Sequence, residues 1–231
     1  MLKLLEESIT SLPFIQDEAA YLAMTSKFEN PFRDKLAFSL FTHYKDSDTN
    51  VRVCREWSSK EKDVSRVDIA IIKIDESPEY LNLIELKATN TQHWYGGFEG
   101  ENQEEKRLNH IRHHIQSLVK QLYNLKKNRE KAKVYGIFIG THPTEKINEK
   151  YNMMVKSCYL TPEEKMDLED IKIAYENTFE EEINACAKNK IWSNCKYNIK
   201  LHNHNPISIP LGEFYTTPIS LLIYIIECEE E

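Results

Sequence analysis

Three charged residues interrupt two otherwise apolar segments of the chain. Asp68 lies in the run Arg66-Val-Asp-Ile-Ala-Ile-Ile, whereas Glu85 and Lys87 lie in Leu83-Ile-Glu-Leu-Lys. Buried charges are costly unless an opposite charge or a metal ion compensates them. Two carboxylates and an ammonium group in such surroundings therefore indicate a site for a cation and a negatively charged substrate.

The two segments have the pattern of a β-hairpin. Strand-like runs over 66–74 and 80–88 are joined by Asp-Glu-Ser-Pro-Glu, which is typical of a turn. Because side chains alternate between the faces of a strand, we expect Glu85 and Lys87 on one face, with Asp68 beside Glu85. Mg²⁺ favours such a site, where one or two carboxylates, waters and a substrate phosphate surround it. The alternative is a solvated hairpin face on which Lys87 pairs with an acid.

The flanking segments predict the elements that position this hairpin. Asn30-Pro31 is typical of a helix start, and apolar residues at steps of three and four between 111 and 125 predict a helix with one buried stripe. The elements expected are, in order, a helix over 30–44, strands over 51–57, 66–74 and 80–88, a helix over 104–131 and a strand over 134–139. This order predicts an α/β fold, with a mixed sheet flanked by helices.

The pattern Asp68 … Glu85-Leu86-Lys87 resembles the signature of the PD-(D/E)XK, or restriction-endonuclease-like, nuclease superfamily, whose core has the order αβββαβ. The resemblance covers about residues 29–140, and Val67 stands where many members have Pro. It implies that Asp68, Glu85 and the backbone carbonyl of Leu86 bind Mg²⁺, with Mn²⁺ as a substitute. It also implies that Lys87 is catalytic. Lys87 would orient or deprotonate the attacking water, or stabilise the pentacovalent phosphate.

Many members of that superfamily add a glutamate from the first helix. Glu29 is our candidate for this accessory acid, with Asp34 and Glu56 as alternatives. An acid near a helix N-terminus is also favourable to the helix dipole, which is an equally good explanation of Glu29. Glu56 has the further alternative of pairing with Arg52 or Arg55 on the surface.

The long helix carries a concentration of positive charge. Residues 103–133 contain nine Lys or Arg against three acids. One helix face is expected to present a polar and basic stripe of Arg112, Gln116, Lys120, Tyr123 and Lys127, which suits a phosphate backbone. Lys120-Gln121 also resembles a superfamily pattern in which this helix contributes a Gln or Lys to the site. Solvated lysines on an ordinary helix are the alternative.

The whole chain is acidic and has an odd number of cysteines. Its net charge is −7 and its five cysteines show no CxxC spacing, which favours a reducing cytoplasm over a disulfide framework. No apolar run reaches the 18 or so residues of a membrane span, so no membrane partner is expected. We expect one domain over 1–231, with the core at about 29–140 and a C-terminal extension over 145–231. A helix is expected to start at Thr161.

The function that these features predict is metal-dependent hydrolysis of DNA, by a restriction or phage-defence endonuclease that favours double-stranded DNA. A homodimer would allow both strands of a palindrome to be cut. The loop over 91–98 either contacts bases with its aromatic and amide side chains or is a mobile loop with a packed Trp, and the second reading is slightly favoured. The alternatives are a catalytically idle module that binds nucleic acid or protein, and a subunit active only with a helicase or ATPase.

Overall fold

A computed structural model describes residues 1–47, 50–58, 66–91, 103–154, 167–188 and 196–230 of the 231-residue chain. Its elements are α1 (Leu2–Thr10), α2 (Glu18–Thr25), α3 (Glu29–Ser47), β1 (Val51–Trp57), β2 (Val67–Ile74), β3 (Pro78–Asn90), α4 (Gln103–Asn128), β4 (Lys133–Pro143), the 3-10 helix η2 (Glu149–Met154), α5 (Leu168–Lys188), β5 (Tyr197–Leu201), β6 (Ile207–Phe214) and β7 (Thr217–Glu230). The predicted α/β class is confirmed. Within the described ranges, no helix is long and apolar enough to cross a membrane.

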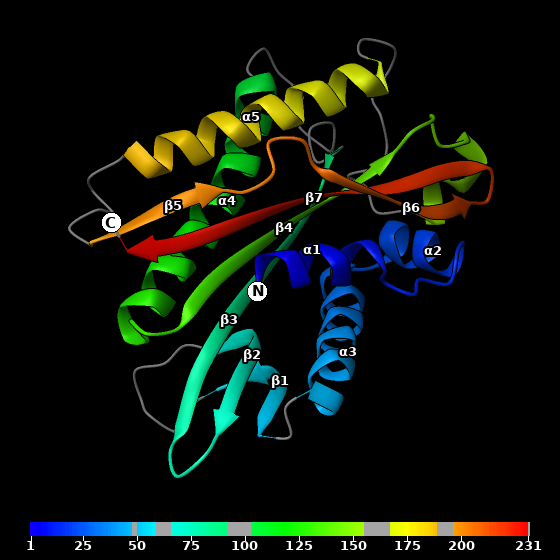
Figure 1. Ribbon diagram of the computed structural model, residues 1–231. Coiled ribbons are helices and arrows are strands. Elements are labelled where there is room, and N and C mark those ends of the chain that lie inside the picture. The colour runs from blue at the N-terminus through cyan, green and yellow to red at the C-terminus, as the bar shows by residue number, and fades with distance from the viewer. Residues whose placement is uncertain (48–49, 59–65, 92–102, 155–166, 189–195, 231) are drawn as a thin grey trace.

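The strands of the described residues form one mixed sheet of seven (Figure 1). Its order is β1-β2-β3-β4-β7-β5, and β6 also pairs with β7. Only β3 and β4 run parallel among the described pairs. Parallel neighbours need a crossover connection, and α4 lies in the segment between these two strands. The predicted hairpin is present, because β2 and β3 pair antiparallel from Ile74↔Pro78 to Ile69↔Ile84.

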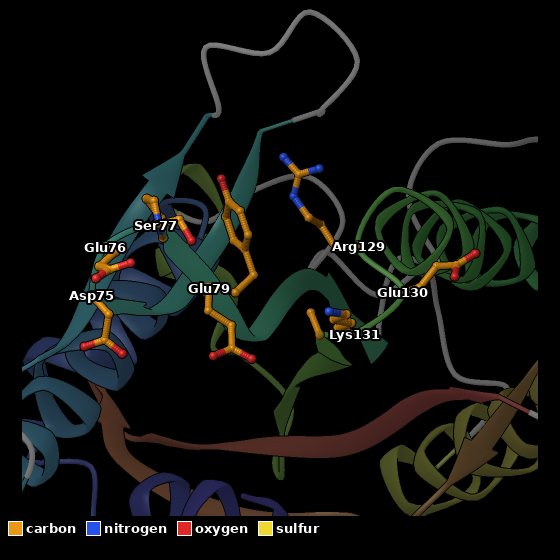
Figure 2. A pocket seen from close by; sticks show the side chains of 10 residues that line it. Asp75, Glu76, Ser77, Glu79, Arg129, Glu130 and Lys131 are labelled. Carbon is orange, nitrogen blue, oxygen red and sulfur yellow. The ribbon is translucent and has the colours of Figure 1, made fainter.

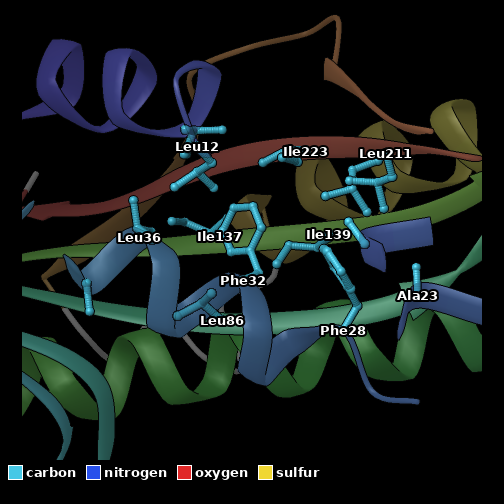
Figure 3. Packing of buried hydrophobic residues seen from close by; sticks show 14 of the residues in the cluster. Leu12, Ala23, Phe28, Phe32, Leu36, Leu86, Ile137, Ile139, Leu211 and Ile223 are labelled. Atoms are coloured by element: carbon cyan, nitrogen blue, oxygen red, sulfur yellow. The ribbon is translucent and has the colours of Figure 1, made fainter. Parts of the chain in front are cut away.

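Helices cover both faces of the sheet. On one face, apolar residues of α1, α2 and α3 pack against alternate residues of the central strands, as Phe32 and Leu36 do beside Ile137 (Figure 3). On the other face, α4 and α5 cover the intervening residues, such as Val134 and Phe138. The central strands are therefore buried on both sides, which explains their nearly continuous apolar sequence.

The C-terminal third of the chain belongs to the same sheet. β7 pairs with β4 over ten positions, from Val134↔Cys228 to Pro143↔Ile219, so the predicted extension contributes strands to the central layer. β4 also continues past Gly140, where the sequence indicated a stop. A Cβ at Gly140 would lie 2.6 Å from the hydroxyl oxygen of Tyr175 on α5. This glycine therefore makes room for a packed helix rather than ending the strand.

Candidate active site

The β2–β3 hairpin brings the predicted carboxylates to neighbouring strands. Pairing between the two strands ends at Ile69↔Ile84, one residue before Asp68 and Glu85 would face each other. Leu83, two residues before Glu85, packs in the cluster under α4 and α5. Because side chains on a strand alternate, Glu85 and Lys87 point to that same face.

Beyond the pair Ile69↔Ile84, side-chain carboxylates accept hydrogen bonds from the backbone amides of β3 that no longer face a strand. The N–H of Leu86 donates a hydrogen bond to Oδ2 of Asp68 at 2.8 Å. The N–H of Ala88 donates to Oε2 of Glu29 at 2.9 Å. A strand residue directs its N–H and C=O to the same edge, so the carbonyl of Leu86 also faces the edge occupied by Asp68. The open edge of β3 therefore gathers two carboxylates from two other elements.

Glu85 is the most deeply buried acid of this group. Its exposed fraction is 7%, and its Oε2 atom has no hydrogen-bond partner among the described residues. Burial is the main cause that raises the pKa of Glu85 to about 8, and the negative charges of Asp68 and Glu29 raise it further. A hydrogen bond from the backbone N–H of Asp68 and the positive charge of Lys87 lower this pKa, but by less. Burial also raises the pKa of Asp68, and the charge of Glu29 acts in the same direction. The protein thus holds several carboxylates close together without satisfying all their oxygens.

A glycine on the next strand explains part of this burial. Gly136 of β4 lies opposite Glu85 in the parallel register. A Cβ at Gly136 would come within 2.9 Å of a methyl carbon of Leu122 and 3.3 Å of one of Leu118. The absence of that Cβ lets α4 approach the sheet closely beside Glu85.

Arg33 is a site residue that the sequence analysis missed. Its side chain is almost fully buried, and its guanidinium contacts Glu56 at 2.7 Å, Asp34 at 3.2 Å and Asp68 at 3.7 Å. Arg33 therefore joins α3 to β1 and β2 beside the carboxylates. An arginine within an amphipathic helix gives no sequence signal for this role, because its partners are distant in the chain.

The three candidates for the accessory acid occupy different positions. Glu29 reaches β3 through the N–H of Ala88. Asp34 instead pairs with Arg55 at 2.7 Å, and Glu56 pairs with Arg33 and Arg66. Of the three, Glu29 is the acid that lies with Asp68 and Glu85, since its charge affects the pKa of both.

The arrangement is suited to a cation with few protein ligands. Across the described residues, no group of three or more His, Cys, Asp or Glu side chains forms a ready-made metal cage. Mg²⁺ commonly needs only one or two carboxylates, with waters and substrate oxygens completing its shell. The unpartnered oxygen of Glu85 beside Asp68 fits that requirement, because a cation would compensate the buried negative charge.

A cleft of about 380 Å³ adjoins the carboxylates. Glu29 and Lys87 line it together with residues from the α2–α3 junction, the end of β3 and α4. Lys87 is half-buried and lines the cleft together with Glu29. An anion that enters this cleft can therefore contact Lys87.

The predicted basic stripe on α4 is only partly a free surface. Gln116 donates a hydrogen bond to Glu182 of α5 at 2.8 Å, and Arg112 contacts the same carboxylate at 3.6 Å. Tyr123, placed on the stripe by its spacing, is instead buried in the core. The physical reason is that α4 packs against α5 as well as the sheet, which the period of α4 alone does not reveal.

The remaining residues of that prediction have mixed environments. Lys120 and Lys127 are exposed, whereas Gln121 has a buried Oε1 atom with no hydrogen-bond partner in the described part of the chain. The predicted base-contacting residues 92–98 lie outside the described residues. So do the side chains of Lys106 and Arg107 and the helix start at Thr161.

A larger cleft, of about 760 Å³, lies away from the carboxylates (Figure 2). It is formed by the β2–β3 turn and the segment between α4 and β4, at the opposite end of β3. Asp75 and Glu79 stand on one side, and Arg129 on the other, where its guanidinium lies 4.6 Å from the Tyr80 ring centroid. This larger cleft is thus separate from the predicted chemistry.

The chain matches no protein-family model, no curated protein and no solved structure. Its function is therefore inferred from the geometry of its own residues.

Proposed function

We propose that this chain is a metal-dependent nuclease of the PD-(D/E)XK type that hydrolyses phosphodiester bonds in DNA. The observation that carries the proposal is the unpartnered, buried Oε2 of Glu85 beside Asp68 on the neighbouring strand. The order α3, β1, β2, β3, α4, β4 supports it, because it agrees with the αβββαβ core of that superfamily. A restriction or phage-defence role is the biological setting that we infer.

Asp68, Glu85 and the carbonyl of Leu86 would hold Mg²⁺ or Mn²⁺, with Glu29 as the accessory acid. When bound, the metal would lower the pKa of a water molecule and offset negative charge on the phosphate. The hydrogen bonds from the Leu86 and Ala88 amides favour this role, because each holds one oxygen of Asp68 or Glu29 at the open edge of β3.

Lys87 is the residue that we assign to the reacting phosphate. It lines the cleft together with Glu29 and lies two residues after Glu85 on β3, where its ammonium group would bind a phosphate oxygen and orient the attacking water. A lysine suits the task because it provides a compact positive charge with three donors. Lys120 and Lys127 are exposed on α4, and we assign them to the DNA backbone farther out.

The test is cleavage of supercoiled plasmid and of single-stranded DNA with Mg²⁺, Mn²⁺ or EDTA. The wild type is compared with Asp68→Asn, Glu85→Gln and Lys87→Ala. Lys131→Ala and Asp75→Asn, at the other end of β3, are the matched controls. We expect metal-dependent cleavage that the three site variants lose and the two controls keep.

Equal cleavage by the site variants would overturn the assignment of the site. An inactive wild type would exclude an independent nuclease. Co-expression with a candidate ATPase or helicase would then separate the partner-dependent subunit from the idle module.

A further inference from the structure

The cleft beside Lys87 is bounded from both faces of the sheet. The α2–α3 junction contributes Lys27 from one face, and α4 contributes His110 and His114 from the other. The end of β3, including Lys87 and Asn90, forms its floor. The cleft therefore lies at the end of β3, beyond Ile84, which is the last residue of β3 that pairs with β2.

The size of the cleft limits what it can hold. Its volume of about 380 Å³ is near the lower end of the range for small-ligand pockets, about 300–1,000 Å³. A ligand of this size is a single nucleotide unit or something comparable. A base inside a stacked duplex cannot enter such a cleft unless it leaves the stack.

The lining of the cleft matches the parts of a nucleotide. Lys27 and Lys87 provide positive charge for a phosphate, and Asn90 provides an amide. The rings of His110 and His114 lie edge to face with centroids 4.5 Å apart, so they form a compact aromatic wall. Single-stranded nucleic acids bind where positive charge for the backbone is combined with ring surfaces for the bases.

We propose that this cleft binds one unpaired nucleotide of a DNA strand, next to the phosphate that Lys87 contacts. His110 and His114 form the wall for the base, and Lys27 contacts the backbone on the opposite side. This inference rests on the proposed nuclease function and narrows its substrate to DNA with an unpaired nucleotide at the site of cleavage. The nucleotide comes either from a single strand or from a duplex that has released a base.

The experiment measures binding in EDTA by fluorescence anisotropy, so that no DNA is cleaved. The probes are a labelled 12-nucleotide oligothymidylate, a fully paired 12-base-pair duplex, and the same duplex with one unpaired thymidine. We expect the single strand to bind at least about tenfold more tightly than the paired duplex. The duplex with one unpaired thymidine is compared with the fully paired duplex. If it binds more tightly, the cleft also accepts an unpaired nucleotide from a duplex.

The variants assign this binding to the cleft. The double variant His110→Ala/His114→Ala is expected to lose about tenfold in affinity for the single strand. His110→Phe/His114→Phe keeps the rings and is expected to retain most of it, which also guards against misfolding. His113→Ala is the matched control, because His113 is exposed on the same helix and lies outside the cleft lining.

Equal affinity for single strand and paired duplex, or unchanged binding by the double alanine variant, would overturn the inference. If the wild type still cleaved DNA in that case, the proposed nuclease function would stand without it. Binding that depends on the histidines, in a protein that cleaves no DNA with any metal, would support the cleft and exclude an independent nuclease.

Discussion

The two ends of β3 present two clefts that differ in size and in chemistry. The cleft at the β2–β3 turn is twice as large, about 760 Å³ against 380 Å³. Its acids are exposed, and Asp75 has its own cation in Lys73 at 3.0 Å. At the other end, Glu85 is buried with an oxygen that has no partner among the described residues. A buried carboxyl oxygen without a partner, rather than volume, distinguishes the end at which we propose a cation site.

Neutralising a carboxylate at each end gives the sharpest contrast. Asp68→Asn or Glu85→Gln is expected to reduce metal-dependent DNA cleavage by more than about 100-fold, because even outer residues that support metal ligands contribute 10- to 100-fold. Asp75→Asn should leave the rate unchanged. Initial rates over a range of Mg²⁺ concentrations measure this. Equal losses at both ends would remove the distinction between them.

The arginines at the two ends of β3 should contribute different amounts to the free energy of unfolding. Arg33 is almost fully buried and contacts Asp34, Glu56 and Asp68. Arg33→Met leaves these acids without their central cation, so we expect a loss of about 3–5 kcal/mol in the free energy of unfolding. Urea unfolding at neutral pH in EDTA measures it. A loss below 1 kcal/mol would show that the network contributes little.

The buried Glu85 should make the stability of the fold depend on pH. In the metal-free protein, mainly burial raises the pKa of Glu85 from 4.5 to about 8. The unfolded chain releases this proton near pH 4.5, whereas the folded chain keeps it until about pH 8. The contribution of Glu85 to the free energy of unfolding is therefore fully favourable below pH 4.5 and is lost as pH rises toward 8, by on the order of 4–5 kcal/mol.

Glu85→Gln removes this titration. In EDTA at pH 8 we expect the variant to be more stable than the wild type, with a smaller difference at pH 5, in urea unfolding at both pH values. Asp75→Asn, which neutralises an exposed acid at the other end of β3, is measured in parallel as the control. A constant difference for Glu85→Gln would show that Glu85 titrates normally.

The smallest effect is expected from Arg129 in the larger cleft. Its guanidinium stacks over the Tyr80 ring, a contact that contributes about 0.5–1 kcal/mol at a partly exposed site. Arg129→Ala should lower the free energy of unfolding by about that amount and leave DNA cleavage unchanged. A large effect on cleavage would give this cleft a part in substrate binding.

Local patterns were enough to predict the hairpin and the long helix. Alternation of side chains fixes the face shared by Glu85 and Lys87, and the turn residues fix the antiparallel return that brings Asp68 close. The apolar period of α4 likewise places Ile111 and Ile115 in the core, where they are fully buried. These predictions succeed because each depends on residues close together in the chain.

The sequence by itself determined the pair of strands, their charged residues and the order of the elements around them. The tertiary structure alone decided which distant groups meet these residues: Arg33 and Glu29 from α3, Glu182 against the basic helix, and β7 beside β4. It also decided that Glu85 is buried, because Gly136 lets α4 approach the sheet. Burial and long-range pairing depend on how the faces of helices and strands pack in three dimensions. A periodic sequence pattern predicts which face of an element is apolar, but it does not predict which other element packs against that face.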